Sequence, residues 1–243
     1  TYAGLLEDTC RIANVLKGLG VQPGDVVGIY LPMIPEAPAA MLACARIGAV
    51  HNVVFGGFSA ESVKERMETS SAKVLITADA TLRRGKPLPM KAALEEVLAE
   101  LPTLEHVLVA SRTGGEVETP MREGRDRWLR AEMEAAQADC AAEGFDSEHP
   151  LFILYTSGST AKPKGIQHTS GGYLTGAAAT HRVIFDIKPE SDVYWCAADI
   201  GWITGHTYIV YGALANGCTS VLYEGAPDYP HQGRFWEIIG RHK

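Results

Sequence analysis

Apolar residues follow two patterns along the chain. In some segments they recur every three or four positions, which is typical of an amphipathic helix, and in others they form short continuous runs, which is typical of a buried strand. Residues 2–19 show the helical pattern and end at Gly20, a residue type that often follows a helix. Residues 26–31 form the first apolar run, so the chain is expected to open with a helix and a strand.

The two patterns alternate through most of the sequence. The predicted helices are residues 2–19, 36–47, 60–70, 91–100, 131–142 and 172–185. The predicted strands are residues 26–31, 49–55, 73–77, 105–110, 151–155, 166–168, 192–197 and 218–223. This alternation indicates an α/β fold with mainly parallel β-sheets covered by helices on both faces.

Two features concern the domain organisation. No linker rich in proline or serine divides the chain near residue 150, so we expect two lobes of one unit, about 1–145 and 146–243. Residues 113–130 have the least regular pattern, with two adjacent glycines and a run of charges. We interpret them as a solvated loop or a small hairpin.

Composition and charge exclude several classes of protein. A hydrophobic fraction of 46% over 243 residues supports a large core, and no apolar run approaches the roughly 20 residues of a membrane span. The net charge of -7 argues against nucleic-acid binding, which needs a concentrated basic patch. The N-terminus lacks the features of a signal peptide, and it begins with Thr1 rather than methionine, as expected for a piece of a longer chain.

Cysteine and histidine spacing predicts no metal site. The five cysteines are widely separated and include no Cys-x-x-Cys pair, which fits free thiols in a reducing cytoplasm. The eight histidines show no metal-ligand spacing, so each is interpreted as a surface residue or a residue that supports a site from behind. We therefore expect a cytoplasmic protein without a structural metal.

Residues 155–165, Tyr-Thr-Ser-Gly-Ser-Thr-Ala-Lys-Pro-Lys-Gly, follow an apolar run and are the strongest candidate for a binding loop. Hydroxyls, a flexible glycine and lysines suit a polyphosphate, because they supply hydrogen-bond donors and positive charge. The P-loop spacing is not met, since that motif requires Gly-Lys-Ser/Thr five residues after Gly158, and the chain has Pro163 and then Lys164 there. The segment is either a nucleotide-binding loop of another kind or only a mobile loop.

Two other segments carry candidate chemistry. Residues 81–86, Thr-Leu-Arg-Arg-Gly-Lys, place three cations around a glycine after the strand 73–77, which suits a phosphate site or a solvated turn equally. Residues 193–207 contain two tryptophans and two glycines. This composition suits either the wall of a small apolar pocket or ordinary core packing.

These segments resemble the AMP-forming acyl-CoA synthetases of the adenylate-forming superfamily, most closely its acetyl-CoA synthetase family. The loop 155–165 matches the superfamily's signature loop, and residues 166–173, Ile-Gln-His-Thr-Ser-Gly-Gly-Tyr, match the acetyl-CoA synthetase form. The resemblance covers nearly the whole chain and weakens only at residues 111–145. Other similar segments are Pro-Met-Ile-Pro-Glu at 32–36, Ala-Cys-Ala-Arg-Ile-Gly-Ala at 43–49, Val-Val-Phe-Gly-Gly-Phe-Ser at 53–59 and Asp-Ile-Gly-Trp-Ile-Thr-Gly-His at 199–206.

The resemblance implies a ligase that acts on small molecules: acetate, ATP with Mg²⁺, and coenzyme A (CoA). Acetate attacks the α-phosphate of ATP to give acetyl-AMP, and the thiol of CoA then displaces AMP to give acetyl-CoA. Lys162 would be the catalytic residue, as a charge partner of the phosphates. The residues implied in ATP phosphate binding are Thr156, Ser157, Gly158, Ser159, Thr160, Ala161, Lys162, Lys164 and Gly165; those in CoA binding are Arg83, Arg84, Gly85, Lys86, Thr204 and Asp228; those in the acyl pocket are Trp202, Ile203 and Thr204.

Three residues depart from the usual pattern of the family. Ala161 stands where the loop usually has glycine, and its methyl group costs on the order of 1 kcal/mol if the position needs a positive φ or a phosphate passes close. Lys86 replaces a common arginine and loses the bidentate phosphate contact. Asp228 stands where an asparagine commonly contacts CoA, so that contact is altered.

The resemblance covers only part of the large N-terminal AMP-binding domain of the family. The later elements match nothing up to Lys243: the Gln-Thr-Glu motif, the ribose-binding aspartate, the hinge, and the C-terminal domain with its adenylation lysine. We therefore expect little or no ligase activity from this chain by itself. Three alternatives stay open: a ligase for propionate or another short acyl chain, a P-loop kinase or NTPase, which the spacing disfavours, and a non-catalytic nucleotide-binding fragment.

Overall fold

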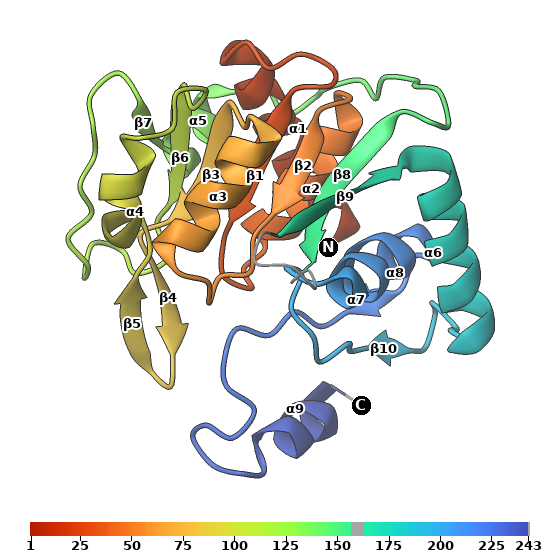
Figure 1. Ribbon diagram of the computed structural model, residues 1–243. Helices are drawn as coiled ribbons and strands as arrows, with labels where there is room; N and C mark the ends of the chain where they lie inside the picture. The colour runs from red at the N-terminus through yellow and green to blue at the C-terminus, as the bar shows by residue number, and fades with distance from the viewer. Residues whose placement is uncertain (157–162, 243) are drawn as a thin grey trace.

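The computed structural model describes residues 1–156 and 163–242, and a central β-sheet organises most of them (Figure 1). Within the described residues, the sheet has seven strands in the order β7-β6-β3-β1-β2-β8-β9. Neighbouring strands pair in parallel, except that β8 and β9 are antiparallel. The strands are β1 (Val26–Tyr30), β2 (Val50–Val53), β3 (Val74–Ala78), β6 (His106–Ala110), β7 (Asp126–Trp128), β8 (Pro150–Thr156) and β9 (Lys164–Thr169).

Helices cover both faces of this sheet because its central strands are buried on both sides, and β1 and β3 are largely apolar. On one face, α1, α2 and α5 pack together, and on the other face α3 packs against α4 (Figure 1). This arrangement confirms the predicted α/β fold with a mainly parallel sheet. The helices are α1 (Tyr2–Gly18), α2 (Glu36–Arg46), α3 (Ala60–Ser70), α4 (Lys91–Leu98) and α5 (Leu129–Ala135).

The chain after β9 forms a second group of elements beside β8 and β9 (Figure 1). Two short strands, β10 and β11, pair in parallel in a sheet of their own. Another pair, β4 (Ala80–Arg83) and β5 (Lys86–Pro89), forms an antiparallel hairpin after β3. The elements after β9 are α6 (Ser170–Ile184), β10 (Val193–Tyr194), α7 (Ile203–Gly205), the π-helix η1 (His206–Tyr211), α8 (Gly212–Ala215), β11 (Thr219–Ser220) and α9 (Arg234–His242).

Several predicted elements differ in extent from the observed ones. The strands predicted at 192–197 and 218–223 contain only two residues each, and α5 is shorter than the predicted helix 131–142. The β4–β5 hairpin, the helices from α7 to α8, and α9 were not predicted. The five cysteines, all within the described residues, are free thiols as expected. The division into two lobes stays a prediction.

The prediction from the sequence differs most from the structure at the end of the segment 113–130. The interpretation as a solvated loop or small hairpin is wrong there, because β7 is a strand that pairs in parallel with β6. Two charged residues at its start, Arg125 and Asp126, have side chains only 9% and 0% exposed. Charged residues become buried in this way only when ions of opposite sign meet them.

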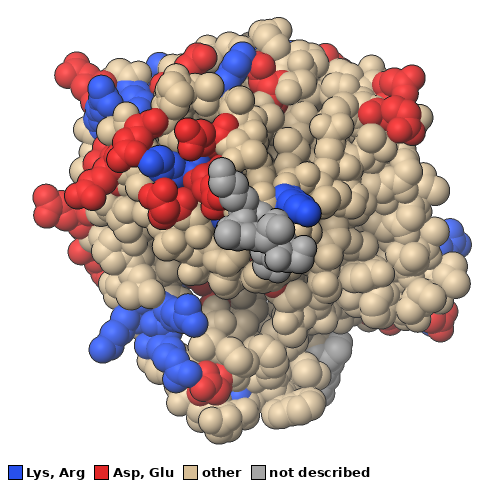
Figure 2. Space-filling view, in the orientation of Figure 1, with Lys and Arg blue, Asp and Glu red and all other residues tan. Residues whose placement is uncertain are grey.

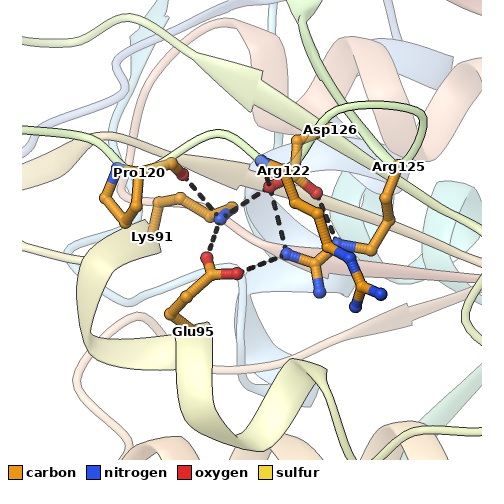
Figure 3. Close-up of polar contacts among 6 residues, drawn as sticks. All are labelled: Lys91, Glu95, Pro120, Arg122, Arg125 and Asp126. Atoms are coloured by element: carbon orange, nitrogen blue, oxygen red, sulfur yellow. Dashed lines mark hydrogen bonds and ion pairs between the residues drawn. The ribbon is translucent and has the colours of Figure 1, made fainter.

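The charges that meet them come from α4 (Figure 3). The amino group of Lys91, whose side chain is fully buried, lies 2.9 Å from a carboxylate oxygen of Asp126 and also pairs with Glu95. Arg125 bonds to both carboxylates, at 2.6 Å from Asp126 and 2.7 Å from Glu95. Burial raises the pKa of Asp126, but hydrogen bonds from Arg125, Arg122 and Lys91 outweigh burial and hold that pKa below its ordinary value. The four ions thus attach β7 to α4.

Histidine and aromatic rings connect the main sheet to the elements that follow it. His51 on β2 stacks on Phe152 of β8, with ring centroids 5.2 Å apart, and its Nε2 lies 2.6 Å from the hydroxyl of Tyr211 on η1. His206, also on η1, has its ring centroid 4.6 Å from that of Phe152. Burial lowers the pKa of His206 to about 4 and that of His51 well below its ordinary value. These histidines are neutral core residues, which the sequence did not reveal.

Replacing the buried lysine is expected to destabilise the fold strongly. The substitution Lys91→Met leaves Asp126 buried with one cation fewer, and the free energy of unfolding should fall by about 3 kcal/mol. Urea unfolding followed by circular dichroism measures this change. The control is Lys17→Met, because Lys17 pairs with Glu143 in solvent, where an ion pair contributes about 0–1 kcal/mol. Equal effects of the two substitutions would contradict the structural role of the cluster.

Acid should destabilise the fold through the buried histidines. The pKa of His206 is about 4 in the folded protein, whereas an ordinary histidine, as in the unfolded chain, has a pKa of 6.5. Its contribution to stability is therefore fully present above pH 6.5, where the ring is neutral in both states. That contribution is lost as the pH falls from 6.5 towards 4, at about 1.4 kcal/mol per unit of pKa difference. Urea unfolding at several pH values measures how steeply the free energy of unfolding falls with pH. This dependence on pH should be weaker in His206→Gln than in the parent. In His242→Gln, at the exposed end of α9, it should equal that of the parent.

Candidate active site

A cavity of about 730 Å³ lies beyond the carboxyl ends of β1, β2 and β3. Parallel α/β sheets bind their ligands at this edge, because the loops that leave the strands converge there. Two later segments of the chain complete its walls. The lining residues are drawn from the ranges 30–33, 55–60, 81–83, 88–94, 195–202 and 223–227, together with Phe235.

Three aromatic side chains form one wall of the cavity. The ring centroids of Phe55, Phe58 and Trp202 lie 5.3 to 5.9 Å from one another. The backbone at Gly201 approaches so closely that a Cβ atom there would lie 2.6 Å from the Cα atom of Phe55. Asp199, whose pKa is raised by burial, accepts a hydrogen bond from the N–H of Gly201 at 2.7 Å. This turn presses Trp202 against the two phenylalanines.

The structure separates the three residues implied in the acyl pocket. Trp202 lies on the cavity wall, with 45% of its surface exposed. Ile203 and Thr204 begin the short helix α7 directly after it, and both are exposed. Neither of them borders the cavity formed by the described residues. Trp202 is therefore the one of the three that the geometry connects directly to the cavity.

The basic segment 81–86 forms the tip of the β4–β5 hairpin at the edge of this cavity. Arg84 and Gly85 have φ values of 51° and 73°, which are the positive values of a two-residue hairpin turn. The turn directs charge outwards, and Figure 2 shows basic side chains gathered where Figure 1 places the hairpin tip. Arg83 borders the cavity. The guanidinium of Arg84 pairs with the carboxylate of Asp228, at 2.6 Å.

The phosphate-binding segment predicted from the sequence is only partly described by the structure. Residues 155–165 were expected to form one loop, but Tyr155 and Thr156 belong to β8, and Lys164 and Gly165 belong to β9. Thr156 pairs with Lys164 across this antiparallel hairpin. The other implied phosphate ligands lie outside the described residues; they are Ser157, Gly158, Ser159, Thr160, Ala161 and Lys162.

Arg66 on α3 is a candidate site residue that the sequence did not single out. Its guanidinium carbon lies 4.7 Å from the ring centroid of Phe58 and 5.7 Å from that of Tyr155. It therefore connects the aromatic wall to the strand that leads into the predicted phosphate loop, through cation–π contacts. The available signal was its position within the apolar stripe of α3, between Val63 and Met67, where a charged residue needs a specific partner.

The described residues offer neither a metal site nor a membrane span. Residues 1–156 and 163–242 contain no group of three or more His, Cys, Asp or Glu side chains that could hold a metal ion. No helix in the same ranges has the length and apolar composition needed to cross a membrane.

Comparison with known proteins adds independent information. The model of the AMP-binding enzyme family matches residues 1–243. The acetyl-coenzyme A synthetases of Streptomyces coelicolor and Streptomyces avermitilis are 57% and 58% identical to the chain over 242 residues, and that of Mycobacterium tuberculosis is 57% identical over 244 residues. Each match covers 100% of this chain but only 37% of the relative. The chain belongs to the AMP-binding enzyme family, as the match over its whole length shows.

Proposed function

We propose that the protein containing this chain is an acetate–CoA ligase that forms AMP. In the first step, a carboxylate oxygen of acetate bonds to the α-phosphorus of ATP, and the bond to the β-phosphate oxygen breaks to release pyrophosphate. In the second step, the sulfur of CoA loses its proton and bonds to the acetyl carbon, and AMP leaves with the electron pair of the broken bond. The products are acetyl-CoA, AMP and pyrophosphate.

The position of the cavity is the observation that carries this proposal. One wall is aromatic, at Phe55 and Trp202, and another wall ends at Arg83 in the basic hairpin. Arg66 contacts both Phe58 and Tyr155, so it connects the aromatic wall to the first residue of the signature loop 155–165. An apolar pocket, a cationic rim and a polyphosphate loop are the three features needed to bind a short acyl group, CoA and ATP together.

We assign roles to the described residues from these positions, and to Lys162 and its neighbours from membership of the family. We assign Trp202 to the acyl end of the cavity, with Ile203 and Thr204 next to it at the start of α7. We assign Arg83, Arg84, Gly85 and Lys86 to the phosphate groups of CoA. The three cations can bind phosphate by charge-assisted hydrogen bonds, and Gly85 lies in the turn between them. Lys162 and the hydroxyls of the signature segment are assigned to the β- and γ-phosphates of ATP. Mg²⁺ is assigned to ATP itself, as part of the substrate.

The names of the relatives support acetate as the acyl substrate, since the matched proteins are called acetyl-coenzyme A synthetases. The matches extend over the whole chain, and therefore over the segments that form the aromatic wall and the hairpin. The chain spans 37% of their length, so we assign the reaction to the longer protein and expect little activity from these 243 residues alone.

Exchange of labelled pyrophosphate into ATP tests the first step. The full-length protein should catalyse exchange that depends on acetate, more slowly with propionate and least with butyrate, if its acyl pocket is built for acetate as the names of the relatives suggest. The 243-residue chain serves as the comparison and should catalyse little exchange. A preference for butyrate would contradict the acetate assignment, and release of ADP instead of AMP would favour a kinase or NTPase.

A further inference from the structure

The β4–β5 hairpin is attached to the segment 223–230 at two points of different strength. At the first point, Glu224 accepts hydrogen bonds from the N–H of Leu82 at 2.8 Å and from the hydroxyl of Thr81 at 3.1 Å. The same carboxylate pairs with Arg112 at 2.7 Å, and its side chain is only 9% exposed. A buried carboxylate with three donors is costly to disrupt, so this attachment is permanent.

The second attachment, at the tip of the hairpin, is exposed to solvent. One nitrogen of Arg84, Nη2, lies 2.9 and 2.6 Å from the two carboxylate oxygens of Asp228. The side chains are 58% and 33% exposed, and ion pairs at such positions contribute little net stability. Gly85 packs closely on Tyr229, since a Cβ atom at Gly85 would lie 2.5 Å from the Tyr229 hydroxyl. Packing of Gly85 on Tyr229 therefore fixes the position of the tip, whereas the ion pair between Arg84 and Asp228 is weak.

Among the described residues, the other two cations of the tip have no such partner. Arg83 and Lys86 form no ion pair within residues 1–156 and 163–242, whereas Arg84 is paired with Asp228. Arg83 borders the cavity, and Pro227, next to Asp228, borders it from the opposite segment. An anion that arrives at the tip thus meets the cations of Arg83 and Lys86, which form no ion pair within the described residues. It also meets Arg84, whose charge is paired with the negatively charged Asp228.

We propose that Asp228 is a specificity-determining residue that competes with the phosphorylated end of the ligand for Arg84. The proposal rests on the assignment of the hairpin to CoA under the proposed function. A phosphomonoester that reaches the tip displaces the Asp228 carboxylate from Arg84, because a dianion interacts more strongly with three clustered cations than a single carboxylate does. Asp228 repels the same phosphate. The affinity of the protein for phosphorylated ligands is therefore lower than its three cations alone would give.

Calorimetric titration of the full-length protein with CoA and with dephospho-CoA, which lacks the 3′-phosphomonoester, tests this competition. Asp228→Asn keeps the size of the side chain and removes its charge, and it should lower the Kd for CoA by about threefold to fivefold, the factor that one surface ion pair supplies. The Kd for dephospho-CoA should change much less. At about 1 M salt, where the Debye length is about 3 Å, the gain for CoA should disappear.

Two further variants show whether the effect passes through Arg84. In the Arg84→Gln background, the Asp228→Asn substitution should give a smaller gain in affinity for CoA than it gives in the parent, because the competed cation is absent. Asp139→Asn, the same substitution at an exposed residue whose carbonyl is bonded to Asn14 on α1, should leave the Kd unchanged. Equal Kd values for CoA in Asp228→Asn and the parent would overturn the proposal, as would equal gains for CoA and dephospho-CoA.

Two measurements, pyrophosphate exchange and CoA binding, distinguish failure of the ligase assignment from failure of the role proposed for Asp228. If acetate-dependent pyrophosphate exchange is absent while Asp228→Asn still tightens CoA relative to dephospho-CoA, the ligase assignment is wrong and the role of Asp228 stands. If exchange is present and Asp228→Asn leaves both Kd values unchanged, only the role of Asp228 is wrong. Absence of CoA binding in every variant overturns it as well.

Discussion

Parallel pairing of β1 with β2 and β3 determines where the parts of the candidate site lie. Because the three strands run in the same direction, the segments that follow them leave at one edge of the sheet and meet there. The aromatic wall follows β2, and the basic hairpin follows β3. The sheet also packs closely on α3, since a Cβ atom at Gly28 of β1 would lie 2.2 Å from the sulfur of Met67. The position of the site is thus a consequence of core packing.

The second group of elements completes the site by docking on this sheet. Gly201 approaches the backbone of Phe55, and η1 packs its histidine and tyrosine on β2 and β8. Neutral imidazole rings are suited to this position, because they pack as flat aromatic surfaces and Nε2 of His51 can still bond to the Tyr211 hydroxyl. The same rings make the contact sensitive to protonation, which would place a charge between the two groups of elements.

The sequence was informative where stability comes from a local pattern. Strands β1, β3 and β6 are continuous apolar runs, and α3 has both a helical period and a serine cap at Ser59, so their positions were predicted closely. Strand β7 was missed because its charged residues are stabilised by Lys91, a residue far away in the sequence. The loop 155–165 and the basic segment 81–86 could be singled out by composition, but the pairing of Arg84 with Asp228 depends on tertiary contact and has no local signal.

Two ion pairs of the same chemistry have opposite roles because of their exposure. Lys91 and Asp126 are both fully buried, so separating them would leave charges in the core without water to solvate them. Arg84 and Asp228 are 58% and 33% exposed, so water can solvate both when they separate. The first pair can only support the fold, whereas the second can exchange its partner for an incoming anion. In a chain with a net charge of -7, the exchange proposed for Arg84 would let a few cations at the hairpin tip bind a phosphate.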